Sequence, residues 1–362
     1  MFLWDWICRD DKMDMMYVED CCEILDFMRV PIVASEREKG KYPYYGANGI
    51  QDYVADYIFD DELVLLAEDG GNFGSRERPI AYRVSGKCWV NNHAHVLKPK
   101  DELDVDYLCY SLMFYKVDGM VNGATRQKLT QAAMRKMQIP SRSMDEQKQI
   151  VDELNRIIKI KKQRQKELVL LDDLIKARFV EMFGDPIINS RHLETKNLQN
   201  VLMFKAGDFT AASDISDEPS ETNPYPCYGG NGIRGYVSEY NQDGEYSLVG
   251  RQGALSGNVQ FAVGKFKNTE HALLVTPIVE MNNTWLNHLL LNLDLKRYQT
   301  GAAQPGLSVK NLQEIQIICA PIDQQNQFAD FVRQTDKSKV AVQKALDETQ
   351  MLFDSLMQEY FG

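Results

Sequence analysis

The chain has 362 residues, 44% of them hydrophobic, which is typical of a globular protein with two or three domains and a sizeable core. No apolar run reaches the roughly 18 residues that a membrane-spanning helix needs, and a net charge of −11 argues mildly against a protein that binds nucleic acid alone. The seven cysteines are scattered without a C-x-x-C pair, which favours reduced thiols in the cytoplasm.

The first 143 residues have a mixed pattern. The opening segment Met1–Cys8 is apolar but short, and it lacks a basic lead and a small-residue cleavage site. We therefore expect a first strand or packing segment there rather than a signal peptide. Further on, short apolar runs such as Leu63–Ala67 are bounded by Gly, Asn and Pro, which predicts strands and loops, and residues 104–115 have a helical pattern.

Residues 144–183 predict one long helix, because Gly and Pro are absent and Glu, Lys, Gln, Leu and Ile dominate. Ser143 or Asp145 is a candidate N-cap, and Gly184 followed by Asp185-Pro186 is a stop signal. At a rise of 1.5 Å per residue the helix would be about 60 Å long. Apolar residues at 4-3 spacing form a coiled-coil seam: Ile150, Leu154, Ile157, Leu168, Leu171 and Ile175.

The second half of the chain repeats the first. The stretch Tyr42–Ile50 reads Y-P-Y-Y-G-A-N-G-I, and Tyr225–Ile233 reads Y-P-C-Y-G-G-N-G-I, 183 positions further on. Residues 185–321 again predict strands and Gly-rich turns, and residues 322–362 a second long helix. We expect the two helices to pack antiparallel through their seams, the second of which comprises Phe328, Val332, Val342, Leu346, Phe353 and Leu356.

Catalytic motifs are weak or missing. The stretch Gly230–Gly235 fits G-x-G-x-x-G, but its first-half counterpart loses two of the three glycines, so a turn is the better interpretation. Asn223–Pro226 resembles the N-P-P-Y of adenine methyltransferases only in composition and is better explained by a turn before a strand. The five histidines do not cluster with carboxylates or thiols at metal-ligand spacing. The sequence thus predicts no catalytic centre, no metal and no cofactor.

The repeated loops instead carry polar residues suited to DNA. Asn and Gln can read adenine through paired hydrogen bonds, and Arg can contact phosphate or guanine. Local capping, turn-forming glycines with positive φ (Gly46, Gly49, Gly229 and Gly232) and ordinary solvated arginines are the alternative explanations. The candidate loop residues are Tyr45, Asn48, Arg76, Arg126, Gln127, Tyr228, Asn231, Arg234, Arg251 and Gln304.

The predicted helices carry a basic cluster, which comprises Lys159, Lys161, Lys162, Arg164 and Lys166, with Lys337, Lys339 and Lys344 at similar places in the second helix. In an antiparallel pair these clusters would lie side by side, and Lys161 and Lys339 would fall on the seam itself. Either they contact a DNA phosphate backbone or an acidic partner, or they form a solvated polar break that sets the register.

Four motifs together carry a family resemblance: the repeated Y-P-x-Y-G-x-N-G-I, Thr269–Leu273 (T-E-H-A-L), Gln304–Ser308 (Q-P-G-L-S) and Met182–Pro186 (M-F-G-D-P). Over its whole length the chain resembles the DNA-specificity subunit of type I restriction-modification systems. The resemblance implies an α+β fold with two pseudo-twofold-related target-recognition domains, 1–143 and 185–321, separated by long helices, 144–184 and 322–362, that form an antiparallel coiled coil.

The resemblance also implies function. Each recognition domain would read one half of a bipartite, asymmetric double-stranded DNA site, and the helices would dock two methyltransferase subunits, with restriction subunits joining the complex. The specificity subunit would have no catalytic centre. The first half departs from the motifs, with Asn91–His95 for Thr269–Leu273, as expected if the domains read different half-sites. A protein scaffold with no role on DNA, and a specificity half that retains nuclease or methyltransferase activity, are the alternatives.

Overall fold

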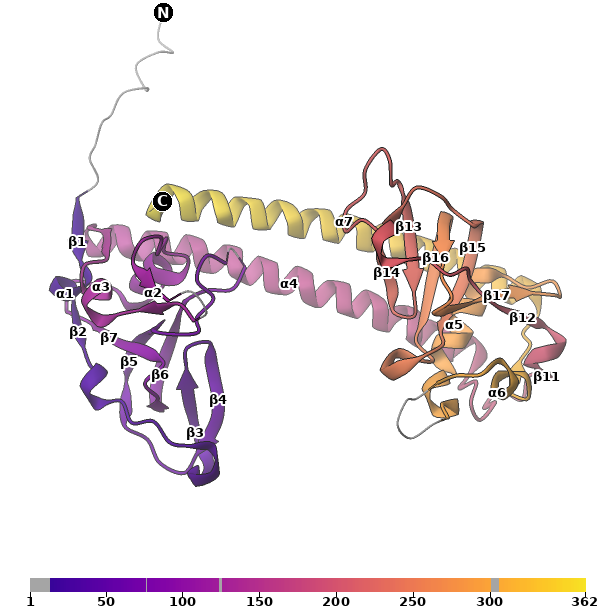
Figure 1. Ribbon diagram of the computed structural model, residues 1–362, viewed down its shortest axis with the longest axis horizontal. Coiled ribbons are helices and arrows are strands. Elements are labelled where there is room, and N and C mark those ends of the chain that lie inside the picture. The colour runs from indigo at the N-terminus through magenta and orange to yellow at the C-terminus, as the bar shows by residue number, and fades with distance from the viewer. Residues whose placement is uncertain (1–13, 76, 124–125, 301–305) are drawn as a thin grey trace, which may run out of the picture. The chain divides into compact units, whose positions relative to one another are not determined.

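A computed structural model describes residues 14–75, 77–123, 126–300 and 306–362 (Figure 1). The expectation for Met1–Cys8 and the candidates Arg76 and Gln304 lie outside these residues. The chain divides into two compact units: unit 1 is Met1–Gln163 with Leu346–Gly362, and unit 2 is Arg164–Ala345. Each long helix therefore contributes to both units. The four-segment division of the chain stays a prediction.

Unit 1 is built on a six-stranded sheet in the order β2-β7-β5-β6-β3-β4. Neighbouring strands are antiparallel except β3 and β6, which are parallel and pair Tyr44 with Trp89 and Tyr45 with Val90. The strands are β2 (Cys22–Ile24), β3 (Lys39–Gly46), β4 (Gly49–Val54), β5 (Phe59–Ala67), β6 (Ala81–Val90) and β7 (Ala94–Pro99).

The central strand β5 has a continuous apolar run because both faces of the sheet are covered there. Successive side chains of a strand point to opposite faces of the sheet. Val64 and Leu66 enter the larger core of unit 1, which also contains residues of helix α2 (Val105–Met113), whereas Leu63 and Leu65 enter a smaller core on the other face. All four are fully buried, as a strand covered on both faces requires.

Unit 2 has a sheet of the same topology, in the order β12-β17-β15-β16-β13-β14. Here too a single pairing among the described strands of the sheet is parallel, and it joins β13 to β16. The identical order confirms that the chain is a duplicated α+β domain. The strands are β12 (Leu202–Ala206), β13 (Tyr225–Gly229), β14 (Gly232–Val237), β15 (Gln242–Gly250), β16 (Val259–Asn268) and β17 (Ala272–Pro277).

The short elements also correspond. Thr130 caps α3 by accepting from the Ala133 amide, and Ser308 caps α6 by accepting from the Asn311 amide. The short helices are α1 (Val18–Cys21), α2 (Val105–Met113), α3 (Gln131–Arg135), α5 (Asn283–Asn292) and α6 (Val309–Gln313). Three two-stranded pairs are β1 (Met15–Tyr17) with β10 (Gln138–Pro140), β8 (Val121–Asn122) with β9 (Lys128–Leu129), and β11 (Thr195–Asn197) with β18 (Gln316–Ile318).

Six single 3-10 turns complete the described elements: η1 (Asp26–Met28), η2 (Ala34–Glu36), η3 (Leu198–Asn200), η4 (Ala212–Asp214), η5 (Gly253–Leu255) and η6 (Leu295–Tyr298).

The two long helices are α4 (Met144–Phe183) and α7 (Ile322–Phe361), drawn in magenta and yellow in Figure 1. Ser143 is the cap of α4: its hydroxyl and amide bind the Glu146 carboxylate, at 2.6 and 2.9 Å, in a capping box. At the other end Gly184 has φ +77°, and its amide donates to the Val180 carbonyl. Among the described residues no helix is long and apolar enough to cross a membrane.

A repeated glutamine anchors each long helix to its unit. The Oε1 atom of Gln147 accepts from the Asp104 amide at the start of α2, at 2.8 Å, and Gln325 does the same for the Asn282 amide before α5, at 2.9 Å. Both side chains are buried, with 0% and 3% exposure. The repeated Asp-x-Gln at the start of the helices therefore has a structural explanation, since a buried amide needs these partners.

Within each unit the long helices pack antiparallel. In unit 1 the Tyr360 hydroxyl donates to Glu153 at 2.6 Å, and Phe353 joins the core that contains Leu154 and Ile157. In unit 2 the Phe179 ring lies 5.5 Å from the Phe328 ring. The predicted seam is confirmed, because all its residues in α4 and α7 are buried or half-buried.

Candidate nucleic-acid interface

The turn between β3 and β4 meets the end of β5 in unit 1. Asn48 is exposed, and its Nδ2 donates to the Gly70 carbonyl at 2.9 Å. Gly49 takes a φ of +106° in this turn, which favours glycine. The Asn48 side chain therefore ties one loop to the next.

The segment before α3 reaches the same place. The Gly70 amide donates to the Gln127 carbonyl at 3.3 Å, and the Leu129 amide donates to the Glu68 carbonyl at 2.7 Å. Arg126 pairs with Asp69 at 2.8 Å, although its side chain is 58% exposed. An exposed ion pair of this kind contributes little free energy, so Arg126 can exchange Asp69 for a phosphate or a base. Three predicted residues, Asn48, Arg126 and Gln127, are thus brought together.

In unit 2, hydrogen bonds connect the end of β15 with the segment before α6, as they connect the end of β5 with the segment before α3 in unit 1. The Arg251 amide donates to the His271 carbonyl at 3.0 Å, and the Arg251 carbonyl accepts from the Leu307 amide at 2.9 Å. In the β13–β14 turn, Asn231 accepts from Asn258 Nδ2 at 2.8 Å. Asn231 and Arg251 are both exposed. Sequence reasoning did not find Asn258, because the loop that supplies it is not part of the repeated motif.

Arg234 lies on β14 with its aliphatic stem across Gly229. A methyl group on Gly229 would come within 2.5 Å of Arg234 Cδ, and one on Gly46 would collide with the amide of Gln51, the equivalent residue of β4. Neither Gly46 nor Gly229 has a positive φ, so the expectation of turn glycines is wrong for these two. They are needed for close approach of a neighbouring side chain.

The predicted tyrosines are packed beside the small cores. The Tyr45 ring lies 5.7 Å from that of Tyr82, and the Tyr228 ring 5.4 Å from that of Phe266. Burial raises the pKa of both Tyr45 and Tyr228. Both are half-buried. This geometry favours a supporting role for the two rings rather than base contact.

The basic cluster on the helices divides into two groups. The Lys161 ammonium binds Gln350 and lies 5.1 Å from the centre of the Phe353 ring. Lys339 binds Asp172 at 2.6 Å and Asp336 at 3.1 Å. These two seam lysines are engaged inside their units, which favours the register-setting interpretation over phosphate contact.

The burial of Lys339 lowers its pKa, but the carboxylates of Asp172 and Asp336 outweigh that effect and raise the pKa overall. Arg164 is half-buried, whereas Lys159, Lys162 and Lys166 are exposed. The exposed lysines are the ones that a phosphate backbone can reach.

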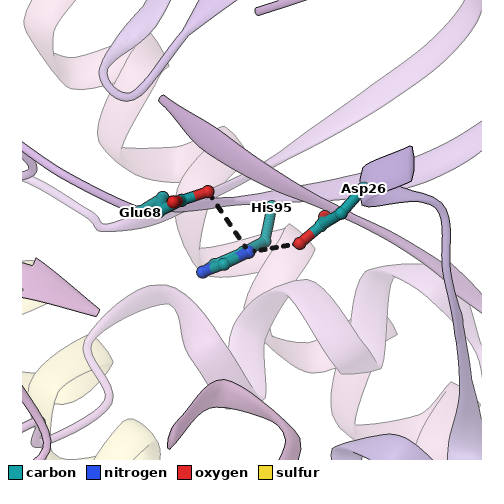
Figure 2. A group of neighbouring side chains, drawn as sticks. All are labelled: Asp26, Glu68 and His95. Atoms are coloured by element: carbon teal, nitrogen blue, oxygen red, sulfur yellow. Dashed lines mark hydrogen bonds and ion pairs between the residues drawn. The ribbon is translucent and has the colours of Figure 1, made fainter. Parts of the chain in front are cut away.

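Asp26, Glu68 and His95 form a buried cluster in unit 1 (Figure 2). The Nδ1 atom of His95 is 2.7 Å from Asp26 Oδ2 and 3.7 Å from Glu68 Oε2. The histidines show no metal-ligand spacing with carboxylates along the sequence, but the fold brings His95 beside two carboxylates. The three residues come from distant segments of the chain, so no local spacing could reveal them.

The cluster already contains its cations. Arg29 binds Glu68 at 2.5 Å, and Lys128 binds Glu68 at 2.8 Å. Burial would raise the pKa values of Asp26 and Glu68, but the hydrogen bonds from His95 to Asp26, and from Lys128 and Arg29 to Glu68, lower both. Because hydrogen bonds and neighbouring cations already stabilise the ionised carboxylates, the geometry favours a hydrogen-bonded charge network over a metal site.

Comparison with known proteins agrees with this architecture. The family model described as the type I restriction modification DNA specificity domain matches residues 10–170 and 192–349. These two matches cover most of the chain, one in each half. The chain belongs to the family of type I restriction-modification specificity subunits.

Individual relatives match only part of the chain. The EcoprrI specificity subunit of a type I restriction enzyme from Escherichia coli is 43% identical over 141 residues, 39% of this chain and 35% of that protein. A protein of Haemophilus influenzae, provisionally named as such a subunit, is 37% identical over 134 residues, 37% of this chain and 34% of that protein. The aligned stretches thus span about a third of these relatives.

Solved structures match the whole fold. The S subunit of a type I restriction-modification system from M. genitalium has a TM-score of 0.59 at 16% identity, covering 98% of both chains. A structure described as the basis of complex assembly and conformational transition of the type I system has a TM-score of 0.58 at 14% identity, covering 96% of this chain and 97% of that one. At such identities the likeness extends to the fold alone.

Proposed function

We propose that the chain reads a bipartite double-stranded DNA sequence, with one half-site read by each unit. The observation that carries the proposal is the loop cluster present in both units. Each brings together the β3–β4-type turn, the end of the β5-type strand and the segment before the short α3-type helix. The turn keeps its asparagine, Asn48 or Asn231, whereas the other polar groups differ: Arg126 and Gln127 in unit 1, and Arg251 in unit 2. A common frame with divergent polar groups suits two different half-sites.

We further propose that the chain contributes no catalytic group and works with two methyltransferase subunits and restriction subunits in the cytoplasm. Exposed apolar residues on α4 support a docking role, since Val169, Leu170 and Leu174 are 58%, 54% and 48% exposed. Partner subunits would also supply positive charge that a chain of net charge −11 lacks.

A domain exchange tests the proposal. Residues 185–321 are replaced by the equivalent segment of a family member with a different target, and the methylated motif of the assembled complex is determined by methylation sequencing of host DNA. One half of the motif should change and the other should stay. The reciprocal exchange of residues 1–143 is the matched control and should alter the opposite half.

Other outcomes separate the alternatives. A motif altered in both halves, or in neither, contradicts the assignment of one half-site to each unit. A complex that assembles but does not bind DNA would favour the scaffold. Methyl transfer to DNA by the purified chain with S-adenosylmethionine would favour a retained enzymatic activity.

A further inference from the structure

The ring of His95 links Asp26 to the backbone of Leu129 through two hydrogen bonds. Its Nε2 is 2.9 Å from the Leu129 carbonyl, and its Nδ1 is 2.7 Å from Asp26. A carbonyl can only accept, so Nε2 is the donor to Leu129, and the second hydrogen bond joins Nδ1 to the Asp26 carboxyl group. His95 is 0% exposed, so both bonds are sheltered from water.

Asp26 is itself fixed in place. It accepts from the Val96 amide and from Gln131 Nε2, both at 2.9 Å. Through His95 and Asp26, the Leu129 carbonyl is therefore connected to the sheet at Val96 and to α3 at Gln131. Leu129 closes the segment that carries Arg126 and Gln127.

The neighbouring bonds act on the same segment. The Leu129 amide binds the Glu68 carbonyl at 2.7 Å, and the Lys128 ammonium binds the Glu68 carboxylate at 2.8 Å. The ionisable groups of this cluster are Asp26, Arg29, Glu68, His95 and Lys128, which come from η1 and the residue after it, the residue after β5, β7 and β9.

The described residues of unit 2 do not form a matching network at the equivalent positions. The β12–β17 register places Ala206 opposite Leu273, at the positions that Asp26 and His95 occupy in unit 1, and Arg251 follows β15 where Glu68 follows β5. Leu273 belongs to the apolar core of unit 2. Asp26 and His95 thus belong to a buried hydrogen-bonded network, whereas the matching positions of unit 2 hold an alanine and a leucine, which indicates that the network serves something particular to unit 1.

We propose that His95, held by Asp26, is a positioning residue for sequence reading by unit 1, because it fixes the segment 126–129 that presents Arg126 and Gln127. The inference rests on the proposed function and extends it to a specificity-determining residue that does not touch DNA. Base readout needs its polar groups held to within fractions of an ångström, so a loosened segment loses discrimination before it loses affinity.

Two variants test this role in the full chain. His95→Leu introduces the residue that unit 2 has at this position and removes the bond to the Leu129 carbonyl. The double variant Asp26→Asn, His95→Gln keeps a neutral chain of bonds, since Asn Nδ2 can donate to Gln Oε1 and Gln Nε2 can donate to the carbonyl. Gln131, which donates to the Asp26 carboxylate in the unchanged chain, can turn its side-chain amide so that its Oε1 accepts from the Asn. The double variant separates loss of positioning from loss of folding.

Amide hydrogen exchange measures the positioning without DNA. In His95→Leu, the amides of residues 126–130 and Gly70 should exchange about tenfold or more faster than in the unchanged chain, as expected for a locally opened segment. Exchange in β6 and in residues 306–308 of unit 2 should be unchanged, and the double variant should restore most of the protection. Unaltered exchange at 126–130 would overturn the positioning role.

Methylation sequencing of the assembled complex measures the consequence. In His95→Leu the half-site assigned to unit 1 should accept substitutions while the other half-site stays strict, and the double variant should restore discrimination. A loosened segment with both half-sites equally strict would overturn the role in specificity. Failure of the proposed function would appear instead in the domain exchange with His95 intact, which would then alter neither half-site. The amide hydrogen exchange of residues 126–130 would still test the positioning role by itself.

Discussion

Burial sets the protonation of His288, a residue of α5 whose ring packs edge-on against Phe328 at 5.3 Å. Burial lowers the pKa of His288 to about 4, against an ordinary value of 6.5, and the nearby charges of Asp336, Lys339 and Asp172 act in opposite directions. The folded protein therefore keeps a neutral ring where the unfolded chain would be protonated.

This difference predicts an acid-sensitive unit 2. The unfolded chain takes up the proton first as the pH falls below 6.5, so the contribution of His288 to stability is present above pH 6.5 and is lost towards pH 4. At pH 5 the loss should be about 1–2 kcal/mol. His288→Leu should remove this part of the pH dependence.

Hydrogen exchange in α5 and the first half of α7 measures the effect, because the ratio of rates between the two proteins at each pH cancels the intrinsic chemistry. The unchanged chain should lose about tenfold more protection than His288→Leu between pH 7 and pH 5. A constant ratio would show that His288 does not titrate differently in the two states. Unit 1 provides the internal control.

The long helices show which features of an element can be predicted from its own sequence and which depend on its neighbours. The seam residues, the Ser143 cap and the Gly184 stop could all be predicted, because helical periodicity and capping are local signals. The roles of Lys161 and Lys339 could not, because their partners Gln350 and Asp172 depend on the register between helices. A charge run looks the same whether it contacts solvent, DNA or a facing carboxylate.

The exposed lysines of α4 lead to a prediction about affinity. Replacing Lys159, Lys162 and Lys166 with Gln should weaken DNA binding by the assembled complex for all sequences alike and leave the methylated motif unchanged, because phosphate contacts do not read bases. The slope of log K against log salt concentration should fall by about 1–3, given roughly 0.9 per phosphate contact.

Binding is measured at several salt concentrations on matched and mismatched duplexes. The triple Lys→Arg variant keeps the charge and should keep the slope. An unchanged slope in the Gln variant would instead support a solvated face.

At the scale of the whole molecule, α4 runs from unit 1 into unit 2 without interruption. We predict that helix length sets the gap between half-sites. Repeating Leu168–Leu171 once lengthens α4 by about 6 Å and rotates the residues after the insertion by about 40° around the helix axis. That length is close to two base pairs at about 3.4 Å each.

The methylated motif of this insertion variant should keep both half-sites, since no loop is changed, and gain about two nonspecific base pairs between them. Methylation sequencing of host DNA gives the answer. An assembled variant with the original gap would mean that partner subunits, rather than the helices, determine the spacing.

The duplication and the α+β class could be predicted because the repeated motifs fall at nearly constant shifts. The candidate site was only partly predictable. Asn48, Asn231 and Arg251 stand out as polar residues in repeated turns, whereas the link from Asp26 through His95 to Leu129 joins segments far apart in sequence. Tyr45 and Tyr228 show that a repeated motif residue can also pack beside a core, and their contact with DNA stays a prediction.

The discontinuity of unit 1 has a consequence for synthesis on the ribosome. Unit 2 is one continuous stretch, whereas the core of unit 1 includes Phe353 and packs against Phe361, whose ring lies 5.3 Å from that of Tyr107. After Gln163 the ribosome must add about 200 residues before that core is complete, which takes roughly 10–40 s at about 5–20 residues per second. Nascent unit 1 thus exposes an unfinished apolar surface throughout the synthesis of unit 2, and chaperones have that interval in which to bind it.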